Sequence, residues 1–191
     1  MQKKIQELIQ SSIDAKQQLL LDAALLQTIR ETVEVIVAAF KNGNNVYFCG
    51  NGGSAADAQH LAAEFSGRFY KDRKALPAEA LHCNTSYLTA VANDYSFDVI
   101  YARIIDGLGK KGDVLIGLST SGNSVNIVRA FETARSKGMI TIGLTGITGG
   151  NLKTASNYLL NAPSADTPRI QECHMLIGHI ICQLVEEKYF E

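Results

Sequence analysis

The chain has 191 residues, of which 46% are hydrophobic and 19% are charged, and its formal net charge is -1. This composition is typical of a globular protein with one core, so we expect a single domain over residues 1–191. Binding to nucleic acid or to an anionic membrane needs an excess of Lys and Arg, and with 18 basic against 19 acidic side chains we expect neither partner. The four cysteines form no C-x-x-C pair, which favours reduced thiols in a cytoplasmic protein.

Two helical patterns, over residues 2–21 and 23–41, precede the rest of the chain. Each carries one stripe of apolar residues at helical spacing, namely Ile5, Leu8, Ile9 and Ile13 in the first and Ile29, Val33, Ile36, Val37 and Phe40 in the second. The first stripe can pack on another subunit or on the chain's own sheet, and the pattern does not separate the two. We expect residues 1–43 to form leading helices that pack in an oligomer, and residues 44–191 to form an α/β core.

From residue 44 onward, short apolar runs alternate with helical patterns. Strands are expected at residues 46–49, 113–118 and 139–144, with weaker candidates at 78–81 and 158–160. Helices are expected at residues 55–66, 87–93, 97–108 and 125–137, the last ended by Gly138, and around residues 175–185. That final helix should begin with Thr167 as its N-cap and Pro168 as its first helical residue. The alternation predicts a doubly wound α/β fold with an open parallel sheet.

Loops rich in glycine and hydroxyl groups follow two of the strong strands. The first, Gly50-Asn51-Gly52-Gly53-Ser54, joins a strand to a helix start, and the second, residues 119–124, places four hydroxyl side chains around one glycine. Backbone N–H groups, hydroxyls and helix N-termini can hold an anion without Lys or Arg, and both loops should lie at the carboxyl ends of parallel strands. The alternative for the first loop is a plain turn with Ser54 as the N-cap. The two loops together predict a phosphate-binding site, and a third glycine-rich turn at residues 146–150 is expected to shape its rim.

One histidine and one glutamate lie on the helix that follows the first loop. His60 and Glu64 are four residues apart, so their side chains share a face, and this geometry suits a metal ion. A surface His–Glu pair is the alternative interpretation. We interpret His82 as a strand-end residue, and His174 as a helix or interface residue that can also reach the site.

The two loops resemble those of the sugar isomerase (SIS) domain, and with His60, Glu64, Gln171 and His179 they are similar to the phosphoheptose isomerase family within it. The similarity covers essentially the whole chain. It implies a five-stranded parallel sheet between helices, in a homotetramer whose active sites lie at subunit interfaces. The implied reaction converts the phosphosugar D-sedoheptulose 7-phosphate to D-glycero-D-manno-heptose 7-phosphate through an enediol, the first step toward activated heptose for lipopolysaccharide, capsule or another surface glycan.

The same resemblance implies roles for individual residues. One zinc ion per subunit would be bound by His60, Glu64, Gln171 and His179. The phosphosugar would contact Asn51, Gly52, Gly53, Ser54, Glu64, Asn93, Asp94, Ser119, Thr120, Ser121, Ser124 and Gln171. Isomerisation needs a base for the carbon and an acid for the oxygens, and we assign Glu64 as the base and His179 as the acid. Gln171 and His179 lie roughly 12 Å apart along one straight helix, so either their side chains converge or one of them serves a neighbouring subunit.

A non-catalytic function is the alternative. Certain SIS proteins, such as the DnaA initiator-associating protein DiaA, act as tetrameric protein-binding modules and lack the carboxylate and histidine that correspond to Glu64 and His179. The presence of both side chains in this chain favours catalysis over a regulatory or interaction role.

Overall fold

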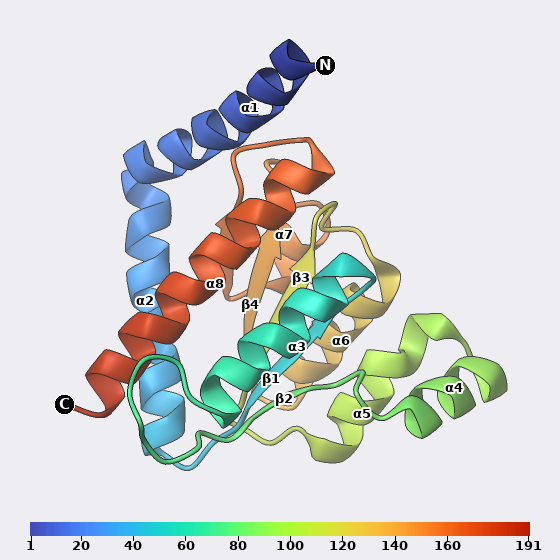
Figure 1. The fold of residues 1–191 in the computed structure, drawn as a ribbon. Helices are drawn as coiled ribbons and strands as arrows, with labels where there is room; N and C mark the ends of the chain where they lie inside the picture. Colours follow the sequence, from blue (N-terminus) through green and yellow to red (C-terminus); the bar gives the residue numbers. More distant parts are fainter.

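The fold is built on one parallel sheet, and the computed structural model describes it over residues 1–191 (Figure 1). The strand order is β2-β1-β3-β4-β5, and every neighbouring pair is parallel. The strands are β1 Val46–Gly50, β2 Ala78–Ala80, β3 Val114–Ser119, β4 Ile140–Thr145 and β5 Tyr158–Asn161. The doubly wound α/β class is therefore confirmed, because the chain runs from β1 outward to β2 and then returns to build β3, β4 and β5 on the other side.

Helices cover both faces of this sheet. They are α1 Gln2–Leu21, α2 Ala23–Lys41, α3 Gly53–Ser66, α4 Thr85–Asp94, α5 Ile100–Leu108, α6 Val125–Ser136, α7 Leu152–Ala155 and α8 Thr167–Tyr189. α2, α3 and α8 share one core with the sheet, and α5, α6 and the short α7 share the other. A 3-10 turn at Phe97–Val99 interrupts the helix predicted over residues 97–108, and α7 is absent from the prediction. None of the helices is both long enough and apolar enough to cross a membrane.

The strands bury side chains on both faces of the sheet. Phe48 and Ile116 belong to the core under α3 and α8, whereas Tyr47 and Leu115 belong to the core under α5 and α6. All five residues of β1 are buried. Each fully buried large apolar side chain contributes about 1.5–3 kcal/mol relative to an exposed one. This two-sided burial explains why the strands read as continuous apolar runs instead of alternating patterns.

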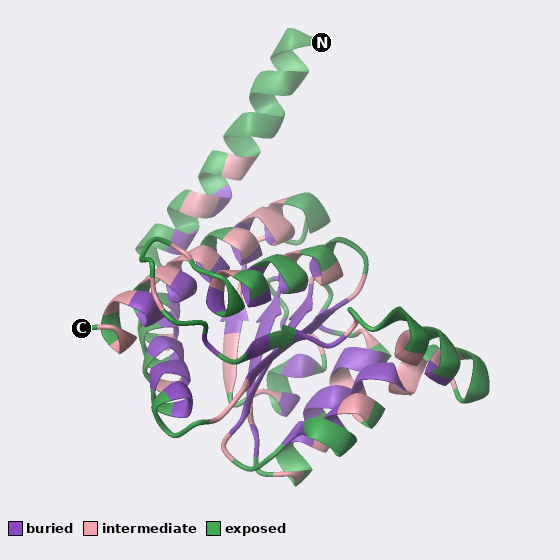
Figure 2. Ribbon diagram, turned by 60° about the horizontal axis from the view of Figure 1, so that its bottom comes forward, coloured by how far each residue is buried: buried purple, intermediate pink, exposed green.

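The two leading helices differ in how they pack. α2 buries its stripe, including Ile29 and Val33, in the core shared with α8. α1 extends away from the body of the molecule and is exposed along most of its length (Figure 2). The stripe residues Ile5 and Ile9 are 51% and 56% exposed, so of the two alternatives left open by the pattern, packing of this stripe on the chain's own sheet is wrong.

Two helix starts also differ from the prediction. α3 begins at Gly53 with Gly52 as its N-cap at φ +56°, so Ser54 is not the N-cap. The positive φ of Gly52 turns the chain into the helix two residues earlier than a serine cap would. α8 is capped by Asp166, whose carbonyl accepts the hydrogen bond of the Ile170 N–H, so Thr167 is already helical.

Candidate active site

The first glycine-rich loop leaves the C-terminal end of β1 and opens directly into α3. A Cβ at Gly50 would lie 2.3 Å from the carbonyl oxygen of Ser54, so the turn requires glycine at this position. The carbonyl of Gly50 accepts a hydrogen bond from the hydroxyl of Tyr101 on α5. Burial raises the pKa of this hydroxyl, which keeps it a donor. The loop therefore directs the positive end of the α3 dipole toward the end of the sheet.

The second loop, residues 119–124, leaves the end of β3, the neighbour of β1 in the sheet. The hydroxyl oxygens of Ser119 and Ser124 lie 3.0 Å apart, and α6 begins immediately after Ser124. Gly122 has a φ of +67°, and a Cβ there would lie 2.2 Å from the carbonyl oxygen of Gly149 in the third glycine-rich turn. The N–H of Gly146 donates to the carbonyl of Thr120 at 3.0 Å, so the third turn supports the second loop from behind.

A reciprocal pair of amides joins the two loops. Asn51 in the first loop and Asn126 on α6 exchange two side-chain hydrogen bonds of 2.9 and 2.8 Å. Asn126 is only 2% exposed. The strand order reverses between β1 and β3, which is where open α/β sheets bind their ligands. Asn126 could not be predicted from the sequence, because nothing in the helix pattern distinguishes it from an ordinary residue in the first turn.

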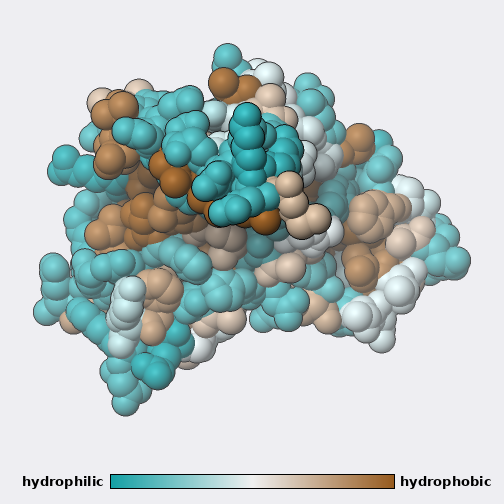
Figure 3. All heavy atoms as spheres, turned by 45° about the horizontal axis from the view of Figure 1, so that its top comes forward, coloured by the Kyte–Doolittle hydropathy of each residue, from teal (hydrophilic) through white to brown (hydrophobic).

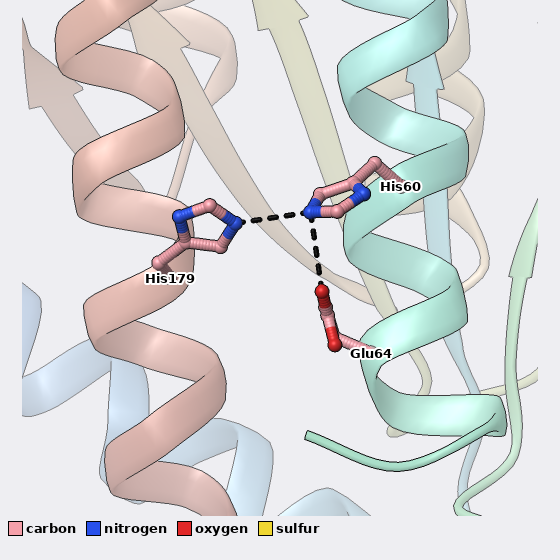
Figure 4. Close-up of side chains that lie close together, drawn as sticks. All are labelled: His60, Glu64 and His179. Atoms are coloured by element: carbon pink, nitrogen blue, oxygen red, sulfur yellow. Dashed lines mark hydrogen bonds and ion pairs between the residues drawn. The ribbon is translucent and has the colours of Figure 1, made fainter. Parts of the chain in front are cut away.

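Three side chains from α3 and α8 meet between these two helices (Figure 4). His60 Nε2 lies 3.1 Å from an oxygen of Glu64 and 3.0 Å from Nε2 of His179, although 119 residues separate the two histidines. A surface His–Glu pair does not account for His179, which reaches the same point from another helix. The structure therefore brings together three of the four residues that the resemblance assigned to a metal.

The three groups fit a metal ion. One ligand atom from each of His60, Glu64 and His179 lies within 4.8 Å of the others. Ligand bonds of about 2 Å in tetrahedral geometry place neighbouring ligand atoms roughly 3.3 Å apart, which is close to the 3.1 and 3.0 Å that separate His60 Nε2 from Glu64 and from His179. Imidazole nitrogen and carboxylate oxygen are ligands that zinc and related divalent ions accept.

Gln171, the fourth expected ligand, lies two turns before His179 on α8. Its amide nitrogen donates to a carboxylate oxygen of Asp57 at 2.8 Å. A Cβ added at Gly53 would lie 2.6 Å from the same nitrogen, so the amide packs against the start of α3. Burial raises the pKa of Asp57, and the hydrogen bond from Gln171 lowers it in part. Asp57 is absent from the predicted site, although its place one turn before His60 in the sequence is a signal that could have identified it.

The remaining expected substrate contacts do not form one hydrogen-bonded group. Asn93 and Asp94 end α4, and the Asn93 amide donates to the Asp94 carboxylate at 2.9 Å. α4 lies at the edge of the molecule, on the side away from α8 (Figure 1). Neither side chain is hydrogen-bonded to the glycine-rich loops of its own chain. By contrast, Thr120 and Ser121 lie in the second loop, as expected.

Of the other two histidines, His174 is buried and His82 is half-buried. His174 is fully buried in α8 and donates from Nε2 to the carbonyl of Thr145 at 3.1 Å, and burial lowers its pKa to about 4. It is a core residue of the helix. His82 follows β2, as expected for a strand-end residue, and burial lowers its pKa. Its Nδ1 has no hydrogen-bond partner.

Comparisons with known proteins give consistent names. A family model described as "SIS domain" matches residues 11–146. The chain is 52% identical to a phosphoheptose isomerase of Clostridium acetobutylicum, over 97% of this chain and 95% of that protein. It is 50% identical to a phosphoheptose isomerase of Aneurinibacillus thermoaerophilus, over 95% of this chain and 92% of that protein. The solved structure of phosphoheptose isomerase GmhA from Neisseria gonorrhoeae superposes with a TM-score of 0.91 at 40% identity, covering 97% of this chain and 98% of that one.

Proposed function

The chain belongs to the SIS domain family and, within it, to the phosphoheptose isomerases, and on that premise we propose how its residues convert D-sedoheptulose 7-phosphate to D-glycero-D-manno-heptose 7-phosphate. The product enters activated-heptose biosynthesis for a surface glycan. The observation that carries the proposal is the convergence of His60, Glu64 and His179 between α3 and α8, in a chain whose strands β1 and β3 end in two loops of the kind that hold phosphate.

The phosphate end of the sugar is bound by the two loops. Backbone N–H groups at the starts of α3 and α6 supply donors, together with the hydroxyls of Ser119, Thr120, Ser121 and Ser124. Asn51, Gly52, Gly53 and Ser54 form the other wall. Neutral donors and helix dipoles explain how a chain with a net charge of -1 can take an anionic substrate. Binding the phosphate aligns the reacting carbons with the side chains of α3 and α8.

The chemistry moves one proton between adjacent carbons. Glu64 removes a proton from C1 of the open-chain ketose while His179 donates a proton to O2, which gives the enediol. Return of a proton to C2, with loss of the proton from O1, gives the aldose. Glu64 is mostly buried, with 18% of its side chain exposed, and it lies within one hydrogen-bond network with His60 and His179. This arrangement allows protons to be relayed among the three groups.

One zinc ion per subunit would be held by His60, Glu64, His179 and Gln171 before the sugar binds, and Glu64 and His179 would leave the ion to act as base and acid once the sugar is bound. When bound, zinc supplies a Lewis acid that polarises the sugar oxygens. The donor set and its spacing support this assignment. Ligation by Gln171 requires its amide to leave the hydrogen bond with Asp57.

A homotetramer completes the site in this proposal. The exposed stripe of α1 and the hydrophobic surface where α1, α2 and α8 meet, which includes Leu20, Leu26 and Leu176, supply the area for subunit contacts (Figure 3). Because Asn93 and Asp94 are not hydrogen-bonded to the loops of their own chain, we assign them to the site of a neighbouring subunit. The four free cysteines support a reducing, cytoplasmic location.

Direct observation of the reaction tests the proposal. The protein with added Zn²⁺ is incubated with sedoheptulose 7-phosphate, and the products are followed by phosphorus NMR. The proposal predicts a new heptose phosphate resonance that grows with time and with enzyme concentration. Binding of the sugar phosphate without conversion, at high enzyme and saturating Zn²⁺, would contradict the isomerase and favour the non-catalytic alternative.

A further inference from the structure

A buried ion pair organises the segment between α3 and β2, residues 67–77. Arg73 Nε donates to a carboxylate oxygen of Glu186 at 2.8 Å, and the two side chains are only 3% and 2% exposed. Glu186 lies on α8, while Arg73 belongs to the connecting segment. A buried pair of charges is tolerated only when further hydrogen bonds satisfy both groups, so the partners of each charge identify what the pair holds in place.

Each charge is saturated by backbone groups. The carboxylate of Glu186 accepts from the N–H groups of Phe69, Tyr70 and Lys71 at 3.1, 2.8 and 2.8 Å. Burial raises the pKa of Glu186, but these three donors and Arg73 outweigh it, so the pKa lies below its usual value and the carboxylate stays charged.

The guanidinium of Arg73 binds the end of α3. It donates to the carbonyls of Glu64 and Phe65, both at 2.7 Å, and to that of Gly67 at 3.0 Å. The last carbonyls of a helix have no partner within the helix, so Arg73 acts as the C-terminal cap of α3. One of the capped residues, Glu64, is the proposed catalytic base.

The same segment also reaches the histidine on α8. The ring of Phe69 stacks on the ring of His179, with centroids 5.9 Å apart and planes inclined by 30°. Glu186 and His179 are seven residues apart, so they lie on the same face of α8. The ion pair therefore fixes both the backbone of Glu64 and the ring that packs against His179, although neither charge contacts the substrate site itself.

We propose that Arg73 and Glu186 are positioning residues, which hold Glu64 on α3 and His179 on α8 at the separation that the metal and the sugar require. An apolar pair of similar volume would often stabilise the fold as well as a buried ion pair does, but it would not cap α3 or anchor Phe69. This inference rests on the proposed function, because it assigns the geometry of the proposed site to these two residues.

The test compares Arg73→Lys with wild type and with Lys188→Met. Lysine keeps the charge, but its single ammonium cannot bond Glu186 and the carbonyls at the end of α3 together. Lys188 forms an exposed ion pair with Glu34 at the far end of α8, so Lys188→Met is the matched control. Apo protein is titrated with Co²⁺ and followed by its visible spectrum. kcat and KM for sedoheptulose 7-phosphate are measured on the Zn²⁺ protein.

For Arg73→Lys we expect an affinity for Co²⁺ at least ~10-fold lower and an altered Co²⁺ spectrum. We also expect a lower kcat. KM should change less than about 3-fold, because the substitution does not touch the phosphate loops. Lys188→Met should match wild type. If Arg73→Lys does not fold, Phe69→Leu decides, since it leaves the ion pair intact and should still weaken Co²⁺ binding. If folded Arg73→Lys has the wild-type Co²⁺ affinity, spectrum and kcat, the inference is wrong and the proposed function is unaffected. If Arg73→Lys does not fold, the same result for Phe69→Leu has the same meaning. A wild-type protein that neither binds Co²⁺ nor turns over substrate would overturn the proposed function as well.

Discussion

Stability at mildly acidic pH should depend on His174. Its Nε2 lies 3.1 Å from the carbonyl of Thr145, and a carbonyl only accepts, so Nε2 carries the proton of a neutral ring. Nδ1 is buried without a partner. A second proton would have to sit on this nitrogen, which has no acceptor from the protein beside it. Burial accordingly lowers the pKa of His174 from 6.5 to about 4.

The direction of the pH effect follows from this shift. Between pH 6.5 and about 4 the unfolded chain binds a proton at His174 and the folded chain does not. The free energy of unfolding therefore falls as the pH falls through this window, and it is unaffected above it. The full shift corresponds to about 3 kcal/mol, of which about 2 kcal/mol is lost by pH 5. Glu186, whose pKa is lowered from 4.5, loses its contribution only at lower pH.

Urea unfolding of wild type and His174→Gln, at one protein concentration and at several pH values from 7.5 to 5, measures this effect. The Gln amide can still donate to the Thr145 carbonyl but does not titrate. Wild type should lose about 2 kcal/mol more than the variant between pH 7.5 and pH 5. Equal pH dependence in the two proteins would refute the reasoning.

Three further substitutions test the loops and the subunit contacts. Gly53→Ala places a Cβ 2.6 Å from the amide nitrogen of Gln171. Because that amide is flexible and can move aside, we expect the variant to fold but to have a kcat at least ~10-fold lower. A normal kcat would argue against a role for Gln171. Asn126→Asp keeps the shape of the amide but removes a donor to Asn51 and adds a negative charge behind the loops. KM and the inhibition constant of inorganic phosphate should therefore rise at least ~10-fold. Unchanged constants would contradict the coupling of the two loops through Asn51 and Asn126. Ile9→Lys puts a charge into the exposed stripe of α1 and should reduce the mass measured by light scattering, whereas an intact tetramer would exclude this stripe from the interface.

The sheet was predictable because its strands carry their own signal. β1 and β3 are buried at every position, so their apolar runs and the glycines at their ends stand out without knowledge of the fold. The helix starts were less predictable. The N-cap of α3 is Gly52, which has a positive φ, and not Ser54. The sequence alone does not tell which glycine of the loop adopts that conformation.

The site was predictable only in part, for a related reason. His60 and Glu64 share a face of one helix, and helical spacing alone reveals that. Their meeting with His179 depends on how α3 packs on α8, which spacing along the chain does not encode. The role of Arg73 could not be predicted from the sequence for the same reason, since its partners are mainly backbone groups that the fold brings together.

The most direct test of the proposed mechanism is the turnover of Glu64→Gln and His179→Gln on sedoheptulose 7-phosphate, with Glu132→Gln on the exposed side of α6 as the matched control. The reaction is run in D₂O, so that proton exchange at C1 and C2 is followed together with conversion. Each site variant should keep the mass of the wild-type assembly and lose at least ~100-fold in kcat, and Glu64→Gln should also lose deuterium exchange, while the control matches wild type. Near-normal turnover and exchange in Glu64→Gln would contradict the assignment of the reaction to this site.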